Sequence, residues 1–248
     1  MSTEYTSTSS FPHAPTSSCN GKMAGGMQGI MSCTQYPPVL EPQPPMCAEA
    51  HERSIAEMLE LRRQRGVAVD EDIWLFAYGS LIWRPECPSI EMERGRIHGY
   101  HRGLYLWSRI HRGTQERPGL VFGLDRGGSC AGVAFRLSRG ELGCHLKSLW
   151  QREMPDGSYR PAWVPCHLKS GRTVLALAFV LKREQANYAG PLPDHVIRDV
   201  FATAYGHCGS TFDYVAQTAE ALRAQRMPDK RLEQLVKRCS PEVPLSDQ

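Results

Sequence analysis

Apolar residues recur along the chain with two spacings, and these spacings predict its strands and helices. Short apolar runs rich in β-branched and aromatic residues predict strands. They lie at 73–78, 90–98, 104–108, 120–124, 130–137, 162–168 and 173–181. The turn sequence Asp125-Arg-Gly-Gly128 predicts a hairpin between the fourth and fifth of these strands, and Lys169-Ser-Gly-Arg172 predicts one between the last two.

Helical spacing of apolar residues appears before, between and after the strands. Ile55, Met58 and Leu59 share one face of a helix predicted over 48–65, which Gly66 ends. Ser138 and Glu141 fit a capping box, so a second helix begins there. Three C-terminal helices are predicted from 193 to near 206, from 210 or 211 to about 226, and from 228 to near 239.

Consecutive strands with one inserted helix and a helical C-terminus predict an α+β domain, with a curled, mostly antiparallel sheet or small barrel. Residues 1–47 are rich in Ser, Thr, Pro and Gly without apolar periodicity, which predicts a disordered low-complexity tail. Residues 48–66 form an extra N-terminal helix, and residues 72–239 form the folded domain. The polar segment 109–119 is longer than an ordinary connection, which is typical of a functional loop.

The glycine loop, Tyr78-Gly-Ser-Leu-Ile-Trp83, interrupts an apolar stretch. Gly79 lets the chain turn sharply and lets a ligand approach the backbone. Successive N–H groups in such a turn form an anion site. We therefore predict a buried loop that holds a small anionic ligand; the alternative is a tight turn in which Gly79 serves geometry alone.

Glu153 continues the apolar series Leu142, Leu146, Leu149 and Trp150, so it points along the buried face near the end of its helix. Burial and the negative end of the helix dipole both disfavour the charged carboxylate and raise its pKa. A raised pKa suits a general acid/base. The alternative is a solvated Glu153, or one paired with Arg152 or Arg160.

Composition limits the other function classes. The net charge of +3 at pH 7 and the absence of a large basic cluster argue against nucleic-acid binding. Nine cysteines without C-x-x-C spacing argue against a disulfide framework and a zinc ribbon, so we expect a reducing cytoplasm. The longest apolar run, 174–181, is too short to cross a bilayer, and no signal peptide is visible. Adjacent Cys-His pairs point apart, so we expect no metal site, whereas a cysteine-nucleophile hydrolase stays open.

Several motifs in consistent order carry a resemblance to ChaC-type γ-glutamylcyclotransferases over residues 72–238. They are the glycine loop followed by Pro85, Gly99-Tyr-His-Arg102 with Leu106-Trp-Ser108, His111-Arg-Gly-Thr114 with Pro118-Gly119, Gly127-Gly-Ser-Cys130 with Gly132-Val-Ala-Phe-Arg-Leu137, Trp150-Gln-Arg-Glu-Met154 with Tyr159, Tyr188-Ala-Gly190, and Gly209 with Tyr214. One departure is Ser210, where many relatives carry Asn after the glycine.

The resemblance implies a γ-glutamylcyclotransferase-like curled mixed sheet or small barrel with surrounding helices. It also implies a lyase that converts glutathione to 5-oxoproline and cysteinylglycine without water, metal or other cofactor. Glu153 is then the catalytic acid/base. The implied substrate-binding residues are Tyr78, Gly79, Ser80, Leu81, Ile82, Trp83 and Tyr214. Two alternatives stay open: a different γ-glutamyl substrate, and a non-enzymatic role in regulating cation transport. The sequence predicts no oligomeric state and no membrane or nucleic-acid partner.

Overall fold

The computed structural model describes Tyr36 and residues 44–68 and 70–241. The predicted tail, residues 1–47, therefore lies outside the described part of the chain except for Tyr36 and residues 44–47. The division into a tail, an extra helix and a domain stays a prediction.

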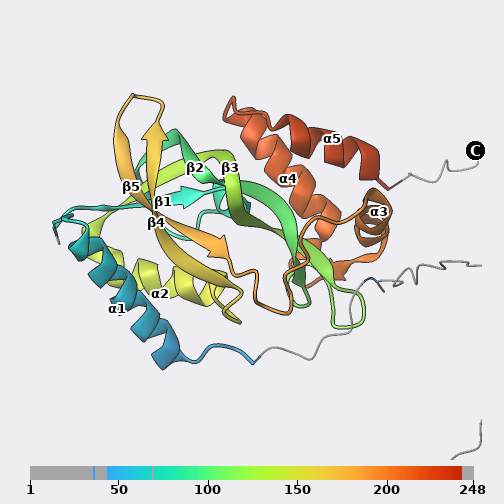
Figure 1. The fold of residues 1–248 in the computed structure, drawn as a ribbon, viewed down its shortest axis with the longest axis horizontal. Helices are drawn as coiled ribbons and strands as arrows, with labels where there is room; N and C mark the ends of the chain where they lie inside the picture. Colours follow the sequence, from blue (N-terminus) through green and yellow to red (C-terminus); the bar gives the residue numbers. More distant parts are fainter. Residues whose placement is uncertain (1–35, 37–43, 69, 242–248) are drawn as a thin grey trace, which may run out of the picture. The chain divides into compact units, whose positions relative to one another are not determined.

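Five strands close into a barrel in the order β1-β3-β2-β4-β5 (Figure 1). They are β1 (Ile73–Ala77), β2 (Ser89–Ser108), β3 (Gly119–Leu137), β4 (Tyr159–Leu168) and β5 (Thr173–Leu181). Neighbouring strands are antiparallel except that β5 runs parallel to β1 and β3. The predicted α+β class with a small mixed barrel is confirmed.

The helices are α1 (Ala48–Gln64), α2 (Leu142–Glu153), α3 (Asp194–Thr203), α4 (Thr211–Ala224) and α5 (Lys230–Cys239). Two short 3-10 turns, η1 (Ser80–Ile82) and η2 (Arg139–Glu141), follow β1 and precede α2. A small ribbon of β6 (Tyr205–Gly206) and β7 (Gly209–Ser210) leads into α4. The side chains of Ser210 and Asp229 cap α4 and α5 by accepting hydrogen bonds from backbone N–H groups.

The predicted hairpin at Asp125–Gly128 is wrong, because these residues continue β3: Asp125 and Arg126 pair with β2, and Gly127 and Gly128 lie at a shift in the register. Opposite them lies Gly99, where the register shifts, and Gly99, Gly127 and Gly128 have φ of 83°, 99° and 70°. These glycines bend a continuous ladder and do not reverse the chain. The strands predicted at 90–98 and 104–108 are therefore one strand, as are those at 120–124 and 130–137. The chain reverses between β2 and β3, at the predicted functional loop.

The barrel core fixes the position of α2. Leu146, Leu149 and Trp150 are buried, and the Trp150 ring meets the Phe179 ring edge to face at 5.3 Å. Burial of each such side chain contributes about 1.5–3 kcal/mol. The same helical periodicity turns the last residue of α2, Glu153, toward the barrel.

Helix α1 is tied to the barrel and to the end of α2. Trp163 Nε1 on β4 donates to the Met58 carbonyl at 2.8 Å. His51 Nε2 hydrogen-bonds the Met154 carbonyl at 2.9 Å, and the Met46 N–H donates to the Pro155 carbonyl at 2.8 Å. Met154 and Pro155 directly follow Glu153, so His51 on α1 and Met46 just before α1 hold the end of α2 in place.

Candidate active site

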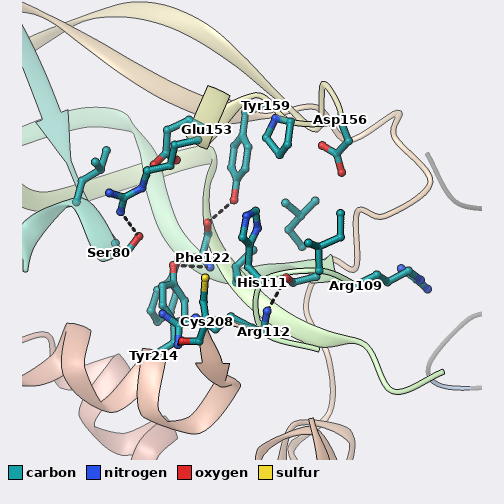
Figure 2. Close-up of a pocket in the computed structure, with 18 of the residues that line it drawn as sticks. Ser80, Arg109, His111, Arg112, Phe122, Glu153, Asp156, Tyr159, Cys208 and Tyr214 are labelled. Atoms are coloured by element: carbon teal, nitrogen blue, oxygen red, sulfur yellow. Dashed lines mark hydrogen bonds and ion pairs between the residues drawn. The ribbon is translucent and has the colours of Figure 1, made fainter. Parts of the chain in front are cut away.

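A cavity of about 460 Å³ lies where the glycine loop, the β2–β3 loop, the end of α2 and the start of α4 meet. This volume falls in the usual range of small-molecule sites. In Figure 2, Glu153 and Tyr159 lie on one side of the space, and Tyr214, Cys208 and Arg112 lie on the other. Segments far apart in the sequence therefore supply its walls.

The glycine loop turns through η1 along the wall of the cavity. Backbone hydrogen bonds within the loop use the N–H groups of Ile82, Trp83 and Arg84. Within the described ranges, no backbone hydrogen bond uses the N–H groups of Gly79, Ser80 or Leu81, all of which line the cavity. Three neighbouring donors of this kind suit an anion or a developing oxyanion.

Gly79 leaves space between the glycine loop and α4. Its φ of −131° lies outside the left-handed region. A Cβ at this position would lie 3.0 Å from the Tyr214 hydroxyl oxygen. The glycine therefore lets the loop approach the tyrosine on α4.

Glu153 is partly enclosed, with 16 % of its side chain exposed. Burial raises the pKa of Glu153 above its ordinary value, and this effect outweighs the neighbouring Arg152 guanidinium, which lowers it; Glu86 raises it further. Of the predicted alternatives for Glu153, pairing with Arg152 is present, because Arg152 Nε lies 3.2 Å from Glu153 Oε1. The raised pKa survives this pairing.

Arg152 links the carboxylate to the glycine loop. Its Nη2 donates to Ser80 Oγ at 2.9 Å, and its Nη1 donates to Glu86 Oε2 at 2.9 Å and to the Arg84 carbonyl at 2.7 Å. One guanidinium thus holds Glu153 and the loop at a fixed separation. The sequence analysis treated Arg152 only as a possible partner of Glu153. Its other partners, Ser80, Arg84 and Glu86, lie 66 to 72 positions earlier in the chain, so no local sequence pattern indicates these contacts.

One peptide unit of β3 holds two tyrosines at the cavity. The Phe122 N–H donates to the Tyr214 hydroxyl at 3.2 Å, and the Tyr159 hydroxyl donates to the Phe122 carbonyl at 2.7 Å. Burial raises the pKa of Tyr214 well above its ordinary value, so the phenol is protonated. Its proton has no acceptor within the described chain and is available to a ligand.

The predicted site residues mostly come together. Lining the cavity are Tyr78, Gly79, Ser80, Leu81, Trp83, Glu153 and Tyr214. Ile82 is buried but does not line it. The Tyr78 hydroxyl is directed away from a ligand role, because it donates to the Phe179 carbonyl at 2.7 Å. Trp83 Nε1 donates to Thr218 Oγ1 at 3.1 Å, which leaves the ring as a wall.

Sequence reasoning missed the cationic residues of the β2–β3 loop, although it predicted that this loop is functional. Arg112 is buried against the rings of Tyr214 and Trp83, and His111 lies beside His207 with ring centroids 5.1 Å apart. Burial and then the neighbouring His207 lower the pKa of His111.

In the part of the chain that the structure describes, no three His, Cys, Asp or Glu side chains are placed to hold one metal ion. The cysteines described there are free. None of the helices among these residues has the length and apolar character to cross a membrane.

The chain belongs to the family of ChaC-like proteins, whose model matches residues 73–241. It is similar to the glutathione-specific γ-glutamylcyclotransferase of Escherichia coli, with 34% identity over 76% of this chain and 80% of the relative. The mouse glutathione-specific γ-glutamylcyclotransferase 1 is 30% identical over 66% of this chain and 76% of its own.

The crystal structure of a yeast γ-glutamyl cyclotransferase specific to glutathione shares the fold. Its TM-score is 0.62 and its identity 23%, over 68% of this chain and 96% of that one. The predicted family and fold are confirmed.

Proposed function

We propose that this protein is a glutathione-degrading γ-glutamylcyclotransferase, a carbon–nitrogen lyase that releases 5-oxoproline and cysteinylglycine. Family membership and the glutathione-specific relatives support this activity. The observation that carries it in the structure is the partly enclosed Glu153, whose pKa is raised by burial and which Arg152 holds beside the backbone donors of the glycine loop.

The reaction is an intramolecular ring closure. The α-amine of the glutamyl group attacks its own γ-carbonyl carbon and forms the new C–N bond. The carbonyl oxygen becomes an oxyanion, and the C–N bond to cysteine then breaks. Because both reacting groups belong to one molecule, holding the substrate folded supplies much of the rate.

Glu153 accepts a proton from the substrate ammonium, which frees the amine to attack, and gives it to the leaving cysteine nitrogen. The ring nitrogen then loses a second proton to the carboxylate, and the released amine takes this proton up, so the proton balance closes without water. The Gly79–Leu81 N–H groups bind the glutamyl carboxylate or the developing oxyanion. The Tyr214 hydroxyl donates a hydrogen bond to the same end of the substrate and stays protonated. Tyr78 and Trp83 form apolar walls. Ile82 acts through packing only.

The reaction class is tested by product analysis with purified protein and glutathione. The expected products are 5-oxoproline and cysteinylglycine in equal amounts by mass spectrometry, without label from heavy-oxygen water. Free glutamate that carries the label would replace the cyclotransferase with the cysteine-hydrolase alternative, for which Cys208 lines the cavity.

A second possible substrate class is γ-glutamyl compounds other than glutathione. A relative from Arabidopsis thaliana with 31% identity carries the broader name γ-glutamylcyclotransferase 2-3. Parallel assays of glutathione and γ-glutamyl amines decide between a narrow and a broad enzyme. A regulator of cation transport is not favoured. We place the enzyme in the cytoplasm as part of the proposal, on the strength of its nine cysteines without C-x-x-C spacing.

A further inference from the structure

Arg112 is a buried cation in the wall of the cavity. Only 7 % of the residue is exposed. Its guanidinium carbon lies 5.0 Å from the centre of the Tyr214 ring and 5.9 Å from that of Trp83. Its Nη1 donates to the carbonyls of Cys208 and Ser210, which fixes the guanidinium plane against the β6–β7 ribbon.

The described chain gives Arg112 no carboxylate partner within ion-pair distance. Another buried arginine of the same protein, Arg102, has one: its Nη2 lies 2.6 Å from Asp229 Oδ2. A charge without a counter-charge is costly to bury. Burial accordingly lowers the pKa of Arg112. The fold therefore keeps an uncompensated positive charge beside the cavity.

The free edge of Arg112 is available to a ligand. Among the described residues, Nε and Nη2 have no hydrogen-bond partner, whereas Nη1 is held by backbone carbonyls. Arg112 lines the cavity, and Figure 2 places it with Tyr214 and Cys208 across from Glu153. An arginine edge with two parallel N–H donors matches a carboxylate.

We propose that Arg112 binds a carboxylate of the substrate through Nε and Nη2 and thereby selects γ-glutamyl peptides that carry it. This inference rests on the proposed function. Glutathione has two carboxylates, one on the glutamyl α-carbon and one on glycine, and they share the chemistry that Arg112 recognises. The substrate carboxylate then supplies the negative charge that Arg112 lacks among the described residues.

The test crosses Arg112→Gln with three substrates. They are glutathione, its glycyl monoethyl ester, and 4-aminobutanoyl-cysteinylglycine, which lacks the glutamyl carboxylate but can still close to pyrrolidin-2-one. A charged hydrogen bond lost on binding predicts a rise of roughly 10- to 100-fold in KM for glutathione, with a much smaller change in kcat. The penalty disappears for the analogue that lacks the bound carboxylate, and this identifies which carboxylate Arg112 holds.

Arg62→Gln is the matched control. Arg62 is also buried, lies over a tryptophan ring at 5.5 Å and donates to two backbone carbonyls, but it lies outside the cavity. We expect the Arg62→Gln variant to be less stable than wild type but to show the same ratios of KM among the three substrates. Arg112→Lys retains the charge and provides a second variant if Arg112→Gln does not fold; its penalty also depends on the carboxylate.

An equal penalty for all three substrates overturns the proposal, because the arginine would then act only on the fold. Failure of the proposed function is separable: wild-type protein would then form no 5-oxoproline. In that case calorimetric titration of glutathione into wild type and Arg112→Gln decides the question, and equal Kd values overturn the role of Arg112.

Discussion

Replacing Glu153 with Gln separates catalysis from stability. The variant retains the shape of the side chain and an oxygen that accepts from Arg152 Nε, at 3.2 Å in the wild type. It loses the titrating group and the charge on that hydrogen bond. The difference between a charged and a neutral hydrogen bond is about 1 kcal/mol. Relief of the buried charge offsets this loss.

The free energy of unfolding should therefore change by less than about 1 kcal/mol, which is about 2–4 °C in Tm for a domain of this size. The sign depends on pH. Burial raises the pKa of Glu153 in the folded state, so its contribution to stability is fully present below the unfolded pKa and is lost as pH rises through the folded pKa. We expect the variant to gain stability relative to wild type as pH rises through that interval.

Activity should fall far more. Loss of a general acid/base costs roughly 10²- to 10⁴-fold in rate, or about 3–5 kcal/mol in the activation free energy. The assay is 5-oxoproline formation by mass spectrometry from pH 5 to 9, beside thermal melting and calorimetric binding of glutathione. Wild-type kcat should rise with pH through an ionisation that the variant lacks. A Glu153→Gln protein that forms 5-oxoproline at a near-normal rate would refute the assignment.

Other perturbations test the loop, the guanidinium and the N-terminal helix. Gly79→Ala places a methyl group 3.0 Å from the Tyr214 hydroxyl, so Tm should fall and recover when Tyr214→Phe is added; melts without recovery contradict the steric explanation. Arg152→Gln removes a charge that lowers the pKa of Glu153, so the rise of kcat should move to higher pH, and an unmoved profile excludes this coupling. Protein that begins at residue 48 should retain activity, whereas protein that begins at 67 loses the contacts of α1 with the end of α2; equal kcat for both would make α1 irrelevant to the site.

Periodicity in the sequence predicted the features that local physics controls. The position of Glu153 follows from helical spacing, because the same face that buries Leu149 also turns the carboxylate inward. The length and polarity of the β2–β3 loop predicted a functional role, and residues of this loop line the cavity. The glycine loop follows from a break between two apolar runs.

Features that depend on the closed barrel were not predictable. Gly127 and Gly128 have the composition of a hairpin, but the ladder continues on both sides of them, with Tyr100 opposite Arg126 and His98 opposite Ser129, so they form a bend. Arg112 contacts the ring of Tyr214, which lies about a hundred residues later in the chain. Ile82 shares the glycine loop with cavity residues, yet the 3-10 turn directs it into the core. Predicting these features requires knowing how strands far apart in the sequence pair, and a short stretch of sequence does not contain that information.

The peptide unit of Phe122 has a consequence for how the site tolerates sequence change. Its N–H and carbonyl hold Tyr214 and Tyr159, so both phenols take their positions from the main chain of β3. Every residue except proline offers the same N–H and carbonyl at position 122. The hydrogen bonds that set the spacing of the two hydroxyl groups therefore do not depend on the side chain at position 122, whereas the buried Phe122 ring packs against the Tyr214 ring at 5.2 Å. The barrel backbone thus fixes where the two hydroxyl groups stand in the cavity, and the Phe122 side chain contributes packing.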